Sequence, residues 1–386
     1  MSVVRVFNGD RLKAARIYRG KTIAELADEV KVSKQSISQY ENGKANPSLE
    51  TLLKLISALG FPRDYFYEKD NKSIKVGTTY FRALLSTNKK DRLSQEEKTK
   101  ILAKIYHTLN QFVQFPKINI PPIREGINDI EKIAQATRDY WKLGTDPIPN
   151  MVYILEKNGF IVTSFGTDNA NIDAFSQRQE VDGEEYFFIV LGSDKSSATR
   201  RQFDAAHELG HIMLHDWNAD LELVSREEFR QMENEAHQFA ASFLLPKEAF
   251  LKDLILPNNL DFYIELKKKW KVSISAMIVR AYQLKAINYN QYQYLMRQIS
   301  KKGWRTKEPL DDVIQVSKPT VLRKAVDVIQ SNGVLSGDQF MQQLSKNNVS
   351  MNKDEVEILL GLDRGTLSEV KQNAVVLSLR HKDVRT

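Results

Sequence analysis

Residues 207–211 are His-Glu-Leu-Gly-His and combine two imidazoles and a carboxylate at a spacing that suits metal chemistry. Positions i and i+4 of a helix lie on one face, so His207 and His211 can reach the same ion. Zinc accepts neutral imidazole ligands and lowers the pKa of its bound water to about 7. Glu208 stands beside the pair and can act as general base on that water. The motif predicts a zinc-dependent hydrolase whose site needs a third protein ligand.

The histidines of the chain gather around this motif. Of six histidines, four lie within 31 consecutive positions, namely His207, His211, His215 and His237. The alternative interpretation is a surface helix that carries two histidines by chance, and the clustering argues against it. We expect His215 to orient substrate or an oxyanion, with a helix-end histidine bonded to backbone as an equally weighted alternative.

A second helix is predicted from about residue 228 to 245, where Pro246 ends it. Its apolar stripe is formed by Ala236, Ala240 and Phe243. Glu235 lies on the adjoining face, together with Phe239 and Ser242, and this direction would bring it toward the helix of the histidines. We therefore expect Glu235 to be the third metal ligand. Glu233, two residues away and on a different face, is the alternative.

Mixed secondary structure is predicted around these two helices. Residues 128–143 and 197–215 have helical patterns, and residues 151–165 give a helix end followed by a strand. Residues 184–193, EEYFFIVLGS, are rich in aromatic and β-branched residues and indicate a further strand, which we take as an edge strand. The histidine motif would thus lie on a helix that follows this strand.

The first 70 residues contain a different set of signals, which are helix caps and a turn. Thr22 is a good N-cap with Glu25 in capping-box position, and a tight break follows at residues 31–32. Ser33 then caps a second short helix whose inward residues are Ile37 and Tyr40. Two short helices joined by such a turn form a helix-turn-helix, in which the second helix enters the major groove of DNA.

The candidate DNA contacts are polar residues at the start of this second helix and near it. Gln35 can pair with adenine through two hydrogen bonds, and Lys34 can reach guanine or a phosphate. Hydroxyls and a further lysine can bond backbone oxygens. The full candidate set is Thr22, Ser33, Lys34, Gln35, Ser36, Ser38 and Lys44. From spacing alone, a small helical domain that binds protein instead of DNA is equally plausible.

The first 70 residues resemble a known regulator family. Residues 8–68 resemble the Xre/Cro repressor family in the segments TIAELADEVKVSKQSISQYENGKANPS and LLKLISALGFPRDYF. One departure is Ile23, where the family often has a glutamine that buttresses the phosphate backbone. The backbone contact is then missing or made by Thr22. The resemblance implies binding to double-stranded operator DNA, usually as a homodimer.

The histidine motif belongs to a second resemblance, which covers about residues 150 to 250. FDAAHELGHIMLH and ENEAHQFAASFLLP resemble the ImmA/IrrE family of metallopeptidases, with His237 where the family commonly has asparagine. The resemblance implies zinc held by His207, His211 and Glu235. It also implies cleavage of a repressor protein, which derepresses genes of mobile elements or stress responses.

Length and composition fit a chain of several domains. The 386 residues suggest two or three domains. TTYFRALLSTNKKDR followed by FPKINIPP resembles the connector of proteins in which the two domains are fused. We expect a mostly α structure with a small β-sheet. The predicted order is an all-α helix-turn-helix domain (1–70), a helical connector (71–122), a zincin-like α+β peptidase domain (123–298) and a C-terminal helical region of unknown role (299–386).

The absence of cysteine excludes disulfides, thiolate metal sites and cysteine nucleophiles. A net charge of +7 favours polyanionic partners. No apolar run approaches the roughly 18 residues of a membrane span, and no stretch of signal-peptide length opens the chain, so we expect a cytoplasmic protein without a membrane partner.

Three functional hypotheses follow from these features. The leading one is a transcriptional regulator whose zinc-dependent endopeptidase domain cleaves a repressor, or the chain itself, in response to a signal. The second is a transcription factor whose zinc domain is not proteolytic and senses a ligand or stress. The third is an antitoxin or phage-defence regulator whose C-terminal region binds a protein partner.

Overall fold

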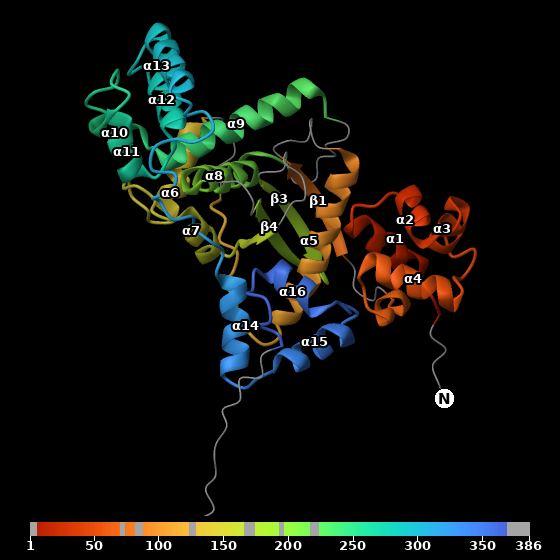
Figure 1. Cartoon of the computed structure of the whole chain (residues 1–386). Helices are drawn as coiled ribbons and strands as arrows, with labels where there is room; N and C mark the ends of the chain where they lie inside the picture. The colour runs from red at the N-terminus through yellow and green to blue at the C-terminus, as the bar shows by residue number, and fades with distance from the viewer. Residues whose placement is uncertain are drawn as a thin grey trace, which may run out of the picture.

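The computed structural model describes residues 6–69, 74–81, 88–122, 129–165, 174–192, 197–216 and 224–368. Within these ranges a small sheet lies between two layers of helices, and a helical bundle is attached at one side (Figure 1). The predicted fold class, mostly α with a small β-sheet, is confirmed. In the same ranges, none of the helices combines the length and apolarity needed to cross a lipid bilayer.

The bundle contains the predicted helix-turn-helix. Thr22 and Glu25 form a complete capping box at the start of its second helix, Lys31 takes a left-handed conformation at that helix's end, and Ser33 caps the next helix. These residues therefore form the helix caps and the turn that the sequence predicts. The elements of the bundle are α1 (Gly9–Tyr18), α2 (Ile23–Val30), α3 (Lys34–Glu41), α4 (Leu49–Leu59) and the short 3-10 helix η1 (Arg63–Tyr67).

The sheet has four strands in the order β1-β3-β4-β2. β4 pairs in parallel with β2 and antiparallel with β3, and β3 pairs antiparallel with β1. The strands are β1 (Ile74–Phe81), β2 (Ile161–Phe165), β3 (Ala174–Val181) and β4 (Glu184–Gly192). The prediction of an edge position for 184–193 is wrong, because β4 has a neighbour on each side and a nearly continuous buried run. Such runs are typical of strands that are covered on both faces.

Two strands are absent from the sequence predictions. Residues 71–122 were expected to be a helical connector, yet they contribute β1 to the sheet before α5 (Lys89–Leu109) begins. β3 is joined to β4 by Asp182 and Gly183, whose φ angles of 51° and 87° are both positive. Asp-Gly is a strong signal for a two-residue hairpin, so the sequence did contain a sign of β3.

One face of the sheet is covered by the helices that carry the histidine motif. Ile189 and Leu191 of β4 join a core with Leu209 and Phe243. The helices of this layer are α6 (Ile130–Tyr140), α7 (Met151–Lys157), α8 (Ala198–Leu214) and α9 (Arg226–Leu244). Next to them lie α10 (Lys247–Asp253), α11 (Phe262–Trp270), α12 (Ile274–Gln283) and α13 (Tyr289–Lys301), which belong to the same core (Figure 1).

The opposite face packs against α5 and the last helices of the described chain. Phe188 and Val190 of β4 share a core with Leu102 of α5 and Leu322 of the C-terminal region. That core continues into the helix-turn-helix bundle, for example at Leu12. The C-terminal helices are α14 (Val321–Ser331), α15 (Gly337–Lys346) and α16 (Lys353–Leu360).

The predicted region 299–386 is therefore not one unit. Its proposed start at residue 299 falls inside α13, whose Leu295 and Ile299 belong to the core that surrounds the histidine motif. The part from α14 to α16 instead fills the other face of the sheet and contacts the bundle. Glu156 of α7 holds the start of α14, because its carboxylate accepts backbone N–H bonds from Thr320 and Val321 at 2.7 and 2.9 Å. Residues 369–386 lie outside the described ranges.

Candidate metal centre and nucleic-acid interface

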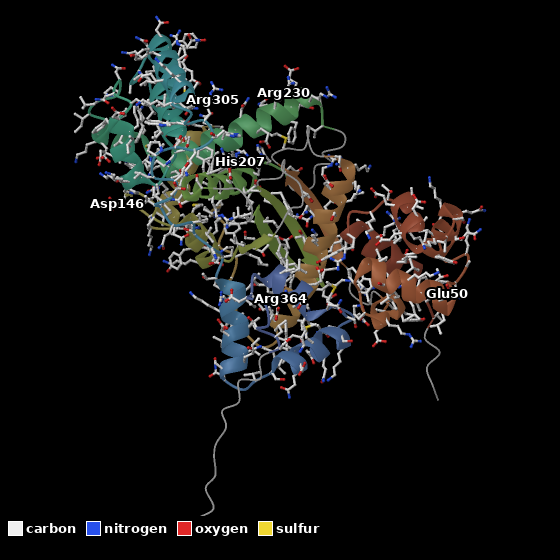
Figure 2. All side chains as sticks on the ribbon, viewed as in Figure 1. Glu50, Asp146, His207, Arg230, Arg305 and Arg364 are labelled. Carbon is white, nitrogen blue, oxygen red and sulfur yellow. The ribbon has the colours of Figure 1, made fainter. Side chains whose placement is uncertain are left out.

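His207 and His211 lie on α8, which begins at its N-cap Ser197 and runs without a break to Leu214. Both imidazoles are fully buried between α8, α9 and the sheet. Figure 2 shows His207 near the middle of the molecule, far from Glu50 on the outer side of the bundle. α9 packs close to the motif, because a Cβ at Gly210 would lie only 3.0 Å from the carbonyl oxygen of Ala236.

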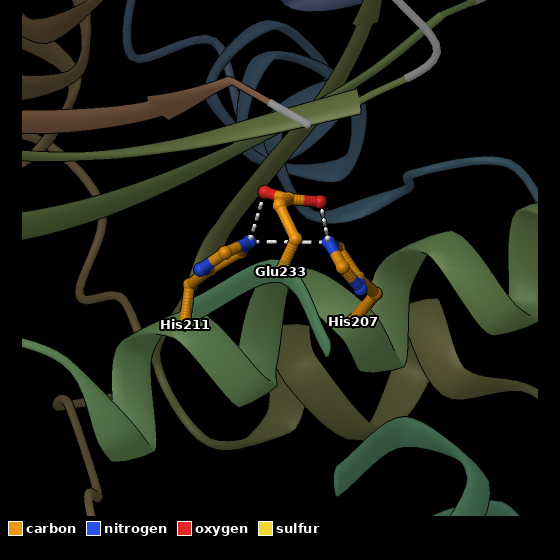
Figure 3. Close-up of side chains that lie close together, drawn as sticks. All are labelled: His207, His211 and Glu233. Atoms are coloured by element: carbon orange, nitrogen blue, oxygen red, sulfur yellow. Dashed lines mark hydrogen bonds and ion pairs between the residues drawn. The ribbon is translucent and has the colours of Figure 1, made fainter. Parts of the chain in front are cut away.

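Three side chains converge beside α8 (Figure 3). The Nε2 atoms of His207 and His211 are 3.1 Å apart. Glu233 of α9 places one carboxylate oxygen 3.4 Å from Nε2 of His207 and the other 3.2 Å from Nε2 of His211. Among the described residues, this is the group of histidine and carboxylate side chains whose spacing can hold a metal ion.

The separations between the donor atoms of this cluster fit zinc. Zinc bonds nitrogen and carboxylate oxygen at about 2.0–2.2 Å in tetrahedral sites, which sets ligand-to-ligand distances of about 3.3 Å. The three observed separations, 3.1, 3.2 and 3.4 Å, lie close to that value. Two imidazoles and one carboxylate are a common zinc donor set that leaves a fourth position open.

The expected orientation of Glu235 is wrong, and Glu233 takes the place assigned to it. The two residues differ by about 200° around the helix, so they cannot point to the same place. Glu233 points to Nε2 of both motif histidines, whereas Glu235 reaches His215 at the end of α8. Ala236 of the apolar stripe and Phe239 both lie against Gly210, so α9 packs on α8 through residues of both predicted faces.

The protonation states suit metal ligands. Burial lowers the pKa of His207 well below its usual value, which keeps the imidazole neutral. Burial would raise the pKa of Glu233, but its hydrogen bonds to His207 and His211 outweigh this and bring the pKa to about 2. The cluster therefore offers a neutral ring and an ionised carboxylate at neutral pH, as zinc requires of such ligands.

A residue of the sheet holds the side chain of Glu208 in place. The hydroxyl of Ser176, on β3, donates to a carboxylate oxygen of Glu208 over 2.7 Å, and both residues are fully buried. Sequence reasoning missed Ser176, because only the packing of α8 on β3 brings Ser176 and Glu208 together. The candidate general base thus has a fixed position beside the histidine pair.

A chain of hydrogen bonds leads from His211 to Glu235. Nδ1 of His211 is 3.0 Å from Nδ1 of His215, and Nε2 of His215 is 3.2 Å from a carboxylate oxygen of Glu235. Burial, followed by the nearby His211, lowers the pKa of His215 to about 4, so the ring is neutral. Both ring nitrogens have partners in this chain, which places His215 between His211 and Glu235. The role of His215 toward substrate or an oxyanion stays a prediction.

His237 supports the site from another side. Its Nδ1 donates to the backbone carbonyl oxygen of Glu233 over 2.7 Å, and its ring centroid is 4.4 Å from that of His207. It also lines a cavity of about 680 Å³ that lies between α8, α9 and the α12–α13 pair. Phe203, Tyr292, Met296 and Trp304 supply much of the apolar wall of this cavity.

The candidate DNA contacts divide into two groups. Lys34 and Gln35 at the start of α3, and Lys44 beyond its end, are exposed. The hydroxyls mostly serve local structure, since Thr22 caps α2 and the Ser33 hydroxyl both accepts from the Ser36 N–H and lies 2.8 Å from the Ser36 hydroxyl. Ser38 lies 3.3 Å from the amide of Asn42.

An ion pair that sequence reasoning missed fixes α3 on the bundle. Arg16 of α1 donates twice to the carboxylate of Glu41, at 2.6 and 2.9 Å, and Glu41 is buried. A bidentate pair of this kind sets orientation as well as distance. It therefore positions the helix whose start carries Lys34 and Gln35.

Comparison with known families agrees with both resemblances. Residues 12–66 match the family model described as helix-turn-helix, and residues 156–282 match the model described as IrrE N-terminal-like domain. The two matches cover separate stretches of the chain. Glu233 and the histidine motif lie within the second matched range.

Several curated regulators are similar to part of the chain. The SPbeta prophage-derived uncharacterized HTH-type transcriptional regulator YonR of Bacillus subtilis is 40% identical over 57 residues, which are 15% of this chain and 53% of YonR. The transcriptional regulator ClgR of Mycobacterium tuberculosis is 38% identical over 61 residues, 16% of this chain and 54% of ClgR. The HTH-type transcriptional regulator ImmR of B. subtilis is 37% identical over 70 residues, 18% of this chain and 55% of ImmR. The chain spans about half the length of the curated relatives it matches.

Proposed function

From a chain that joins a helix-turn-helix domain to an IrrE-like domain, we propose a DNA-binding transcriptional regulator that is also a zinc-dependent endopeptidase. The helix-turn-helix binds double-stranded operator DNA as a homodimer. The second domain cleaves a repressor protein, or the chain itself, in response to a signal. The three curated relatives are all transcriptional regulators by name, which supports the first half of the proposal.

The observation that carries the enzymatic half is the buried triangle of His207, His211 and Glu233. Its dimensions fit a tetrahedral zinc ion, and Glu208 lies next to it on the same helix. A structural zinc site needs no additional carboxylate that can accept a proton. The presence of Glu208, fixed by Ser176, therefore favours hydrolysis over a purely structural role.

Each residue has a distinct task in this proposal. His207, His211 and Glu233 hold zinc, which supplies a Lewis acid that polarises the peptide carbonyl and makes water more acidic. Glu208 takes a proton from the attacking water at its carboxylate and passes it to the leaving amine. Ser176 keeps that carboxylate in position through its 2.7 Å hydrogen bond. The pair of His215 and Glu235 fixes the ring of His211.

Metal content tests the site directly. Elemental analysis of protein purified without chelator should find about one zinc per chain in the wild type. His207→Ala should lose it, because two donors rarely retain the ion. A folded wild type without metal would contradict the proposed centre.

Hydrolysis is tested separately with Glu208→Gln. This variant keeps an oxygen that can accept from Ser176 and leaves the three donors unchanged, so it should bind zinc like the wild type. Its cleavage of an unfolded protein substrate should fall at least about 100-fold, the usual contribution of a general base. Equal cleavage by the two proteins would rule out Glu208 as the base.

Operator binding is tested with Lys34→Ala and Gln35→Ala, since both side chains are exposed at the start of α3. Loss of Gln35 should reduce discrimination between operator and random DNA by about 1–3 kcal/mol. Glu50→Ala on α4 is a control that removes an exposed side chain outside the candidate set. Unchanged specific binding in both test variants would contradict the assignment of α3 as recognition helix.

The cavity beside His237 favours one alternative function, a zinc domain that senses a ligand without proteolysis. Its volume of about 680 Å³ is in the range of small-molecule pockets, and its apolar wall has polar groups at a few positions. A ligand there would touch His237, which packs against His207. This alternative predicts full regulation by the Glu208→Gln variant, whereas the leading proposal predicts its loss.

A further inference from the structure

β3 is the strand that reaches the candidate catalytic base. Ser176, near the start of β3, donates its hydroxyl proton to Glu208 over 2.7 Å. In Figure 3, strands of the sheet run past the donor cluster on the side opposite the α8 backbone. A peptide placed along the edge of β3 that faces away from β4 would therefore pass close to Glu208 and the metal donors.

That edge is occupied by β1 of the same chain. β1 runs antiparallel to β3 from the pair Ile74–Val181 to the pair Phe81–Phe175. Tyr80 stands opposite Ser176, the residue that contacts Glu208. The backbone of β1 thus follows the path that an extended peptide would take to the site.

A strand edge binds extended polypeptide through backbone hydrogen bonds that do not depend on sequence. We propose that β1 is a tethered ligand that occupies the outer edge of β3 and excludes an extended polypeptide substrate from it. The inference rests on the proposed peptidase function. It names a regulation of that site, the exclusion of substrate by a strand of the same chain.

β1 is held less regularly than the other strands. Its register shifts between Val76 and Thr79, whereas β3 and β4 pair through eight positions without a shift. A bulge interrupts the ladder of hydrogen bonds and is common next to active sites. The ion pair between Lys75 and Glu180 is exposed, and such pairs contribute little to stability. β1 can therefore leave the edge at a lower cost than β4 could.

The position of β1 in the chain matters if this strand leaves the sheet. β1 lies between η1 of the helix-turn-helix bundle and α5, so the strand is part of the link between the DNA-binding domain and the sheet. A tethered ligand acts at an effective concentration of about millimolar. A free substrate has to compete with β1, and any event that pulls β1 away opens the edge.

A reversible disulfide can lock β1 in place. Thr79 and Gln177 are paired in register, and their side chains already touch, with Nε2 of Gln177 2.5 Å from Oγ1 of Thr79. Antiparallel partners have Cα atoms about 4.5–5.5 Å apart, which suits a disulfide. The chain has no native cysteine to compete. Gln177 points away from the face on which Ser176 contacts Glu208, because successive strand residues alternate, so the lock leaves the site untouched.

The test uses Thr79→Cys with Gln177→Cys in a Glu208→Gln background, and a fluorescent peptide with the sequence of residues 74–81. The reduced protein should bind this peptide at least about 10-fold more tightly than the oxidised protein, because only free β1 can yield the edge. The single variant Thr79→Cys, treated in the same way, should show no difference. Equal binding by the oxidised and reduced double variant would overturn the proposal.

A second variant replaces residues 74–81 with eight glycine and serine residues. It should bind the same peptide about 10- to 100-fold more tightly than the intact chain, and a scrambled peptide should not bind. A folded replacement variant without peptide binding would overturn the proposal. If this variant fails to fold, the disulfide pair still gives the answer.

Hydrolysis of an unfolded protein, measured with Glu208 intact, separates this inference from the proposed function. Peptide binding that follows the lock without any hydrolysis would contradict the peptidase and leave the binding surface standing. Hydrolysis that is equally fast in the locked and unlocked chain would contradict the surface and leave the peptidase standing.

Discussion

Glu233 and Glu235 are two positions apart on α9, and each contacts a different part of the same site. Glu233 faces both histidines of the motif, whereas Glu235 contacts His215 behind His211. A group that holds the second nitrogen of a metal-bound histidine fixes its orientation. For His211 this group is His215, which Glu235 holds in turn. The two glutamates thus form a matched pair for experiment.

At this scale we predict different losses of zinc affinity for Glu233→Gln and Glu235→Gln. Removing the carboxylate behind His215 should weaken zinc binding about 10-fold, the lower end of the effect seen for outer partners of metal ligands. Removing Glu233 should weaken it much more, because a direct donor is lost. Competition with a chromophoric chelator measures both affinities. A larger loss in Glu235→Gln than in Glu233→Gln would mean that Glu235, and not Glu233, is the direct zinc ligand.

The helices α8 and α9 meet where α8 has a glycine. A Cβ at position 210 would lie 3.0 Å from the carbonyl oxygen and 3.1 Å from the Cα atom of Ala236. Both are backbone atoms, which cannot rotate out of the way as a side chain can. The small residue therefore sets how closely Glu233, one turn before Ala236, approaches the histidines.

We predict that Gly210→Ala destabilises the protein. Helix propensity alone would favour alanine by about 1 kcal/mol. Overpacking against α9 should outweigh this gain and leave a net loss of about 1–2 kcal/mol. Urea denaturation of the metal-free protein measures the change without a contribution from zinc. A net gain in the free energy of unfolding would mean that α9 shifts freely and does not constrain the site.

At the scale of the whole molecule, the sheet connects the candidate metal centre to the helix-turn-helix bundle. One of its faces carries the helices of the candidate metal centre, and the other shares a continuous core with α5, α14–α16 and the helix-turn-helix bundle. Glu355 of α16 reinforces this contact, because it accepts from Arg19 at 2.5 Å and from the hydroxyl of Tyr18 at 2.8 Å. The helices α14–α16 thus connect the bundle to the sheet.

We predict that Glu355→Ala loosens the bundle from the rest of the chain. The partly buried guanidinium of Arg19 loses its charged partner, and a hydrogen bond to a charged group contributes about 1.5–3 kcal/mol. Hydrogen exchange of amides in α1 and α16 should become faster. Glu50→Ala, which breaks the exposed pair with Lys54, is the control and should leave exchange in these helices unchanged. Unchanged exchange in Glu355→Ala would show that the apolar core alone holds the bundle.

Local patterns in the sequence were sufficient for the parts of the protein that short-range physics decides. The capping box of Thr22 and Glu25, the Ser33 cap and the helix that carries His207 and His211 all depend on residues a few positions apart. The two domain families were likewise identified from contiguous segments. The Asp182-Gly183 turn was also a local signal, although β3 was not predicted from it.

Tertiary structure decided the rest, because it depends on contacts between distant segments. The choice of Glu233 over Glu235 was set by the rotation of α9, which follows from its packing on Gly210. Ser176 met Glu208 only because α8 crosses β3. The strand β1 was not predicted although residues 74–81 are rich in β-branched and aromatic types, and only the structure shows that it pairs with β3. The backbone groups at a strand edge can pair with any segment that reaches them. The pattern of residues 74–81 alone therefore cannot show that β3 is the partner of this segment.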